Sequence, residues 1–343
     1  MARVDRRTFL STALAAAAVR QAWAATTQQP AGPGPRGWID LHHHFAPPAW
    51  VTDVRGRPLL QPANTRWTAE QSLEDMDRGG VAAAVVSITN PGLWFGDVAQ
   101  TRRLARACND YGATLVRDHP ARFGVFAALP LPDVDASLKE IEYAFDTLKV
   151  DGIGLYTSYG DTWLGAPAFR PVMAELNRRK ALVTVHPTAA DCCRNLGYAA
   201  GIGPGTIEYG TDTTRAIIGV AFNGDATRYP DIRFIWSHAG GSAPFLAGRI
   251  DGASSGAREA LPNGFLSAFK RFHFDVAGAA NRGALASLTQ WVPTSQIVFG
   301  TDFPPGGSSA SVKAALGEIS FLTPADLQAI GRDNAVRLLP RFA

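Results

Sequence analysis

The chain has 343 residues, of which 46% are hydrophobic, 10% aromatic and only 18% charged. This is enough apolar material for a large buried core, so the composition excludes a disordered or fibrous protein. No apolar run approaches the roughly 18–20 residues that a membrane-spanning helix needs. The net charge of +3 comes from residues 1–24, because the rest of the chain has equal numbers of basic and acidic residues. A nucleic-acid-binding protein needs a basic surface, which this balance does not favour.

Residues 1–24 have the pattern of an export signal. Arg6 and Arg7 precede an alanine-rich apolar stretch, and residues 22–24, Ala-Trp-Ala, form a small-x-small cleavage pattern. The paired arginines resemble the twin-arginine (Tat) signal, which predicts a periplasmic or secreted protein without a membrane anchor once the signal is removed. An ordinary alanine-rich helix is the alternative. Residues 25–37, rich in proline and glycine, would be a flexible tether.

The remaining chain, residues 38–343, alternates short apolar runs with helical patterns. Apolar strands that are separated by helices predict a parallel sheet covered on both faces. Eight such units in about 300 residues predict a single α/β domain, a (β/α)8 TIM barrel, with a doubly wound open sheet as the alternative. Residues 45–68 form an irregular insertion after the first strand, and we expect it to help roof the site. The predicted strands are 38–41, 81–88, 123–127, 152–156, 181–185, 232–236, 272–276 and 297–299. The predicted helices are 69–78, 98–118, 136–148, 169–179, 213–229, 244–250, 283–291, 312–319 and 325–339.

Histidines and one aspartate follow four of the eight predicted strands. His42 and His44 end the first strand, His186 the fifth and His238 the sixth, and Asp302 follows the eighth. The carboxyl ends of barrel strands meet at one mouth, so we expect these side chains to lie close together. Several imidazoles and one carboxylate suit a divalent metal ion such as Zn²⁺, Mn²⁺ or Fe²⁺.

Each of these residues also has a simpler structural interpretation. A lone His-x-His pair is weak evidence for a metal site. His186 could be a buried histidine with satisfied hydrogen bonds, Asp302 a helix N-cap and His238 a turn residue. Strand alternation turns His43 away from its two neighbours, and His273 lies before a buried strand, where a structural role is expected. The joint occurrence at four strand ends is what favours a metal site.

The motifs around these residues resemble the amidohydrolase superfamily. They are Asp-x-His-x-His at 40–44, His-Pro at 186–187, Ser-His-Ala-Gly-Gly at 237–241 and Gly-Thr-Asp-Phe-Pro at 300–304. More narrowly, they are similar to its non-hydrolytic branch, around aminocarboxymuconate-semialdehyde decarboxylase and the salicylate-type decarboxylases. The resemblance implies a (β/α)8 barrel with one divalent metal ion, often Zn²⁺ and in some members Mn²⁺.

The resemblance also implies roles for individual residues. His238 would be the acid/base residue beside the metal. Arg249 matches an arginine that in the family binds the substrate carboxylate across a dimer interface, which would make the protein a homodimer. A solvated helix charge is the alternative for Arg249. The metal ligands implied by position are His42, His44, His186 and Asp302.

Three sequence features refine this comparison. The fourth strand ends without the lysine that bridges two metals in binuclear hydrolases, so we expect one metal ion, with Zn²⁺ ahead of Mn²⁺. The family's second substrate arginine, upstream of the position of Trp67, has no clear equivalent, which argues against a dicarboxylate substrate. Trp94 and Phe95, after the second strand, would offer an aromatic wall to a substrate ring, or else would pack on the barrel rim.

The expected function is metal-dependent removal of CO₂ from a small aromatic or enol-type carboxylic acid. The metal would act as a Lewis acid, and His238, or Asp302 in a second role, would deliver the proton. Arg249 would orient the carboxylate. Two alternatives stay open, a hydrolase that opens a lactone or amide with the same residues, and an exported binding protein on a degenerate barrel.

Overall fold

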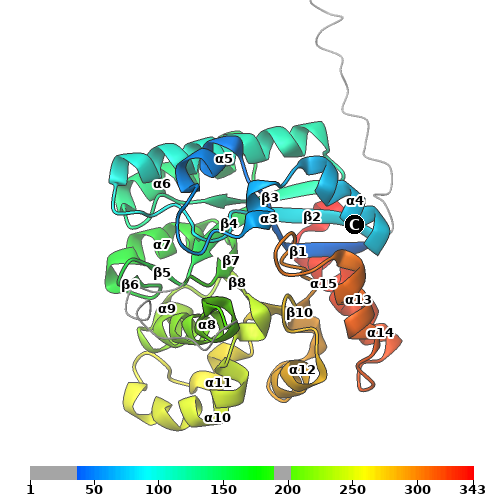
Figure 1. Ribbon diagram of the computed structural model, residues 1–343. Helices are drawn as coiled ribbons and strands as arrows, with labels where there is room; N and C mark the ends of the chain where they lie inside the picture. The colour runs from blue at the N-terminus through cyan, green and yellow to red at the C-terminus, as the bar shows by residue number, and fades with distance from the viewer. Residues whose placement is uncertain (1–36, 189–201) are drawn as a thin grey trace, which may run out of the picture. The chain divides into compact units, whose positions relative to one another are not determined.

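The computed structural model describes residues 37–188 and 202–343. The eight strands of its main sheet are all parallel and follow the order β1-β2-β3-β4-β7-β8-β9-β10 (Figure 1). The amide of Leu41 donates to the carbonyl of Phe299 (2.9 Å) and that of His44 to the carbonyl of Phe303 (2.8 Å), which joins β1 to the segment after β10. The sheet is therefore a nearly closed (β/α)8 barrel, as predicted. The strands are β1 Trp38–His44, β2 Val81–Ser87, β3 Phe123–Ala128, β4 Gly152–Tyr156, β7 Leu182–His186, β8 Arg233–Trp236, β9 His273–Asp275 and β10 Ile297–Val298.

Helices connect the strands and surround the sheet (Figure 1). The longest predicted helix is confirmed, since α5 spans Val98–Asp118 as expected from its amphipathic pattern. In the described part of the chain, no helix is long and apolar enough to cross a membrane. The other α-helices are α2 Pro48–Val54, α3 Pro62–Thr65, α4 Ala69–Gly79, α6 Val134–Glu142, α7 Arg170–Arg178, α8 Pro204–Phe222, α9 Asp225–Arg228, α10 Ala243–Ala253, α11 Phe265–Phe269, α12 Arg282–Thr289, α13 Ser309–Gly317, α14 Pro324–Gln328 and α15 Asn334–Leu338.

Several local boundaries differ from the prediction. The helix expected at 213–229 begins nine residues earlier, at Pro204, because proline is favoured in the first helical turn. It ends at Phe222, and Gly224, with a φ of 85°, starts the separate helix α9. The insertion 45–68 is not irregular throughout, since it holds α2 and α3. A short hairpin, β5 Ser158–Tyr159 with β6 Thr162–Trp163, was not predicted.

The predicted export signal lies outside the described residues, as does all of the predicted tether except Gly37. Their assignment to targeting and to a flexible connection stays a prediction.

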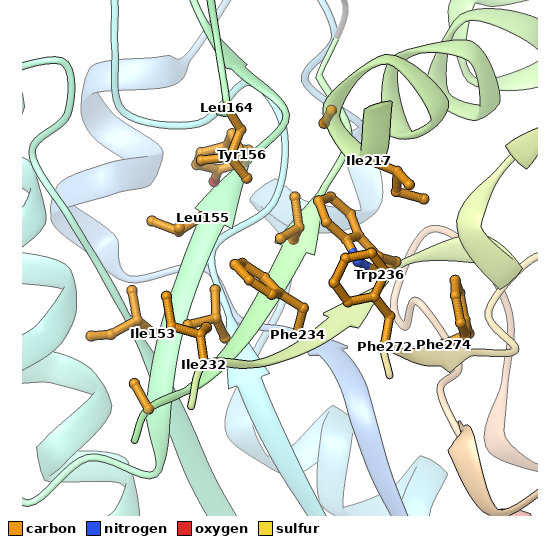
Figure 2. Close-up of a cluster of buried hydrophobic side chains, with 14 of the residues drawn as sticks. Ile153, Leu155, Tyr156, Leu164, Ile217, Ile232, Phe234, Trp236, Phe272 and Phe274 are labelled. Carbon is orange, nitrogen blue, oxygen red and sulfur yellow. The ribbon is translucent and has the colours of Figure 1, made fainter. Parts of the chain in front are cut away.

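Two hydrophobic layers hold the strands in place. The outer layer fills the space between strands and helices, where the rings of Phe234 and Trp236 stack with centroids 5.5 Å apart and Phe272 packs against both (Figure 2). The inner cluster joins residues of strands that are not neighbours, such as Phe126 of β3 and Ile235 of β8, so it fills the barrel interior. Together these layers make a rigid frame for side chains at the carboxyl ends of the strands.

His273 occupies the first position of β9, at the opposite end of the barrel from those strand ends. Burial, together with the charges of Arg233 and Arg337, lowers the pKa of His273 to about 4. The structure thus gives this histidine the structural environment that was expected, with the imidazole neutral in the folded protein at neutral pH.

This environment predicts acid sensitivity from His273. In the unfolded chain His273 is protonated near its ordinary pKa of about 6.5, whereas in the folded protein it stays neutral down to about pH 4. The free energy of unfolding therefore falls as the pH is lowered from about 6.5 to about 4. The contribution of this one group is about 1–3 kcal/mol. Urea unfolding of the chelator-treated protein at pH 7 and pH 5 should show a smaller loss in His273→Gln than in the wild type. Equal losses in the two proteins would contradict the prediction.

Candidate metal centre

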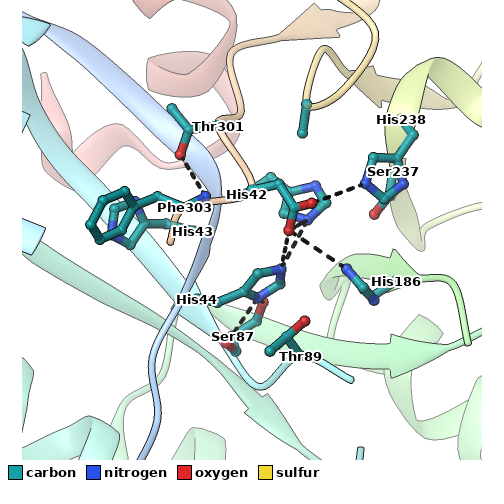
Figure 3. Close-up of polar contacts among 12 residues, drawn as sticks. His42, His43, His44, Ser87, Thr89, His186, Ser237, His238, Thr301 and Phe303 are labelled. Atoms are coloured by element: carbon teal, nitrogen blue, oxygen red, sulfur yellow. Dashed lines mark hydrogen bonds and ion pairs between the residues drawn. The ribbon is translucent and has the colours of Figure 1, made fainter. Parts of the chain in front are cut away.

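Four side chains from β1, β7 and the segment after β10 meet at the carboxyl ends of the strands (Figure 3). Asp302 Oδ1 lies 2.8 Å from His44 Nε2, 3.4 Å from His42 Nε2 and 4.0 Å from His186 Nε2. One potential ligand atom from each residue lies within 4.8 Å of all the others. The buried His186 Nε2 and Asp302 Oδ1 make no hydrogen bond of normal geometry within the described structure. Three imidazoles and one carboxylate arranged in this way could bind one divalent metal ion.

The Nδ1 sides of two of the three imidazoles face backbone carbonyl oxygens. His186 Nδ1 lies 2.8 Å from the carbonyl oxygen of Pro187, and His44 Nδ1 lies 3.2 Å from that of Ser87. Because a carbonyl oxygen can only accept, Nδ1 of both rings carries the proton and donates it. Their Nε2 lone pairs are therefore free to bind a metal, as in most protein metal sites.

The protonation states fit metal binding. Burial lowers the pKa of His186 to about 3 and also lowers the pKa of His44, so both rings are neutral at pH 7. Burial alone would raise the pKa of Asp302, but its interactions with the surrounding imidazoles hold it well below its ordinary value. Burial alone would also lower the pKa of His42, yet the Asp275 and Asp302 carboxylates raise it well above normal. A metal ion would therefore compete with a proton on His42.

Asp275, the last residue of β9, is a functional residue that the sequence analysis missed. Its side chain is fully buried, and its Oδ2 lies 2.8 Å from His42 Nδ1. Its Oδ1 accepts hydrogen bonds from the backbone amides of His238 (3.0 Å) and Ala277 (3.1 Å). One carboxylate thus orients a metal-site histidine and fixes the backbone of His238. A charged residue at the end of an apolar strand was the available signal.

We expect Asp275→Asn to weaken metal binding about 10–100-fold, the usual effect of removing a partner of a ligand histidine. The amide lacks the negative charge that holds His42 Nδ1–H. Competition with a chromogenic chelator measures the affinity. Asp225→Asn is the matched control, because Asp225 is also a buried carboxylate but lies outside this cluster. An unchanged affinity in Asp275→Asn would contradict the role assigned to it.

His43 points away from the cluster, as predicted (Figure 3). Its Nδ1 lies 3.0 Å from Asp40 Oδ2, its Nε2 lies 2.9 Å from Ser72 Oγ, and its ring stacks on Phe303. Asp40 also accepts from the Thr301 hydroxyl at 2.6 Å. These bonds tie β1 to the segment that carries Asp302, so they position the cluster without belonging to it.

Two residues of the site have a strained backbone conformation. His238 and Asp302 have φ values of 55° and 59°, in the left-handed region that few side chains adopt. A Cβ at Gly306 would lie 2.4 Å from the Cβ of Asp302, so only glycine fits there. The unusual backbone brings His238 Nε2 to 3.6 Å from Asp302 Oδ2. His238 therefore lies beside the four potential ligands without being one of them.

A cavity of about 560 Å³ lies over the cluster and is lined by His186, His238 and Asp302. Its size suits a small ligand. Gln61, from the insertion 45–68, also lines this cavity, in keeping with the expected roofing role.

The three expected substrate contacts lie elsewhere. Trp94 and Phe95 line a neighbouring cavity of about 340 Å³, where the Arg57 guanidinium lies 3.7 Å from the centre of the Phe95 ring. Arg249 is exposed on α10 and does not line either cavity. A single chain thus brings together the expected metal ligands and His238, but not these three residues.

Comparison with known proteins places the chain in a family. The amidohydrolase family model matches residues 39–341. The chain belongs to the amidohydrolase family. Within it, the chain is 35% identical to decarboxylase macB of Penicillium terrestre over 322 residues, covering 89% of this chain and 95% of that protein. It is 33% identical to the 6-methylsalicylic acid decarboxylase of Penicillium expansum over 326 residues, covering 89% and 96%.

A solved structure extends the comparison to three dimensions. The crystal structure of 2,6-dihydroxybenzoate decarboxylase complexed with 2,6-dihydroxybenzoate matches with a TM-score of 0.78 and 25% identity, covering 88% of this chain and 98% of that one. The resemblance to the non-hydrolytic decarboxylase branch is therefore confirmed.

Proposed function

We propose that the protein is a metal-dependent decarboxylase of a small aromatic carboxylic acid with a hydroxyl group beside the carboxyl group. The main support is the cluster of three imidazoles and one carboxylate next to His238, in a cavity large enough for a small ligand. Relatives above 30% identity along nearly the whole chain are decarboxylases, and one acts on 6-methylsalicylic acid. This support favours decarboxylation over the hydrolase and binding-protein alternatives.

The reaction exchanges a carboxylate for a proton. A proton adds to the ring carbon, the bond from that carbon to the carboxyl group breaks, its electron pair returns to the ring and CO₂ leaves. A bound divalent metal would supply a Lewis acid for the oxygen atoms of the substrate. His238 Nε2, in the cavity and 3.6 Å from Asp302 Oδ2, is placed to hold and deliver the proton. The Asp302 carboxylate orients that imidazole.

The donor set favours Zn²⁺ as the native metal, with Mn²⁺ as the second candidate. Neutral imidazoles are strong ligands for zinc, and a carboxylate oxygen is accepted by both ions.

The exposed position of Arg249 supports a further part of the proposal. An arginine outside the cavity of its own chain could reach substrate only in a homodimer, where it would act on the carboxylate in the partner subunit. We also propose export through the Tat pathway to the periplasm or the medium, on the pattern of residues 1–24 alone.

The function is tested by incubating the metal-loaded enzyme with hydroxybenzoates and muconate-type acids and measuring CO₂. We expect release from an acid of the salicylate type, and loss of release after treatment with a chelator. Lactones and amides are tested in parallel. Acid release from these compounds without any CO₂ from the carboxylic acids would replace the proposal with the hydrolase.

A further inference from the structure

The wall of the metal-site cavity contains a buried amide whose hydrogen-bonding capacity is largely unused. Asn90 lines the cavity and is only 3% exposed, and neither its Oδ1 nor its Nδ2 makes a hydrogen bond of normal geometry within the described structure. Leaving a buried polar group unpaired destabilises a folded protein, so such groups usually have a partner in the working protein. A group of a bound ligand could satisfy Asn90.

Tyr209 of α8 lies on the same cavity and adds a hydroxyl group. Its ring centre is 6.4 Å from that of His186, which places it close to the cluster. Burial raises the pKa of Tyr209, the negative charge of Asp302 raises it further, and an interaction with the Asn90 amide offsets part of the effect, so Asn90 and Tyr209 form a polar pair. The phenol is therefore protonated at neutral pH and can both donate and accept a hydrogen bond.

The charge of the cavity narrows the kind of group that these two residues can bind. The described residues that line the cavity include no lysine or arginine. In the proposed homodimer, one substrate carboxylate would take up both a bound metal ion and Arg249 of the partner subunit, so a second carboxylate on the ring would have no positive partner among the residues that line the cavity. Burying an unpaired charge is far more costly than burying a neutral hydroxyl group that is hydrogen-bonded.

We propose that Asn90 and Tyr209 form a subsite for a hydroxyl group on the ring of the acid, and that this subsite selects hydroxylated aromatic monocarboxylates. The ring hydroxyl donates to Asn90 Oδ1 and accepts from Asn90 Nδ2 or the Tyr209 hydroxyl. The inference rests on the proposed function and deepens it, because it names the substrate group that the cavity recognises.

Calorimetric binding to the metal-loaded enzyme tests this subsite without a need for turnover. Benzoate, the three monohydroxybenzoates and the benzenedicarboxylates are compared in the wild type, Asn90→Ala and Tyr209→Phe. We expect Asn90→Ala to weaken the best-bound hydroxybenzoate about 10–100-fold while benzoate changes less than about twofold. Tyr209→Phe, which removes one oxygen atom, should act in the same direction with a smaller loss.

Asn64→Ala is the matched control. Asn64 is another buried amide whose polar atoms have no partner in the described structure, but it does not line the metal-site cavity. We expect it to leave the discrimination between benzoate and hydroxybenzoate unchanged. If Asn90→Ala does not fold, Tyr209→Phe still decides the question, because it preserves the ring and its packing.

Three outcomes would overturn the inference. If Asn90→Ala and Tyr209→Phe lose as much affinity for benzoate as for the hydroxybenzoates, the proposed hydroxyl subsite is contradicted. A dicarboxylate that binds more tightly than the monocarboxylates would contradict the charge argument. A loss of discrimination in Asn64→Ala would show that the effect is not specific to the residues of the subsite. Failure of the proposed function looks different, since the wild type would then release no CO₂ from any acid.

Discussion

His186→Ala is expected to reduce the metal content from one ion per chain to nearly none, and to reduce decarboxylation by at least about a thousandfold. His186 supplies one of four converging ligand atoms, and its Nε2 has no other partner in the described structure. The three remaining ligands cannot hold the metal as tightly, because alanine offers no atom that can bind it and the site is buried. Elemental analysis of the dialysed protein measures the loss and also identifies the native metal.

His119→Ala is the control for this prediction, because His119 follows the end of α5 and does not belong to the cluster. It should keep its metal. Circular dichroism shows whether each variant is folded. A folded His186→Ala protein with full metal content would contradict the assignment of the ligands, and a wild type with two ions per chain would contradict a single-metal centre.

The barrel and the cluster were predictable because both follow from periodic features of the sequence. Each strand is a short apolar run, and chain order alone brings the carboxyl ends of parallel strands to one mouth. The side chains of His42 and His44 reach Asp302 while His43 turns to Asp40, as alternation along a strand requires. The pairing register of β1 shifts between Asp40 and His43, but the alternation from His42 to His44 survives it.

Features that depend on long-range contacts were not predictable. Asp275 and His42 are 233 residues apart, and no local pattern marks a carboxylate as the partner of a particular imidazole. Trp94 and Phe95 lie in an irregular segment after β2, where periodicity gives no direction for a side chain. The structure turns them to the neighbouring cavity beside Tyr159. The exposure of Arg249 likewise depends on how α10 packs, which a helical pattern alone does not show.

Removing the imidazole of His238 is expected to lower kcat about 10²–10⁴-fold while the metal content stays at one ion per chain. The side chain lies 3.6 Å from Asp302 but is not among the four ligands, so its loss should remove proton transfer and leave the metal in place. Elemental analysis and CO₂ release from the same protein sample separate these two effects.

The choice of substitution at position 238 matters because the residue has a φ of 55°. Asparagine tolerates the left-handed region better than alanine does, so His238→Asn keeps the local backbone with less strain. Comparable losses of kcat in His238→Asn and His238→Ala would assign the effect to the missing imidazole, and added imidazole should restore part of the activity of His238→Ala. Full activity in His238→Asn would leave the backbone conformation as the important feature and would remove His238 as the proton donor.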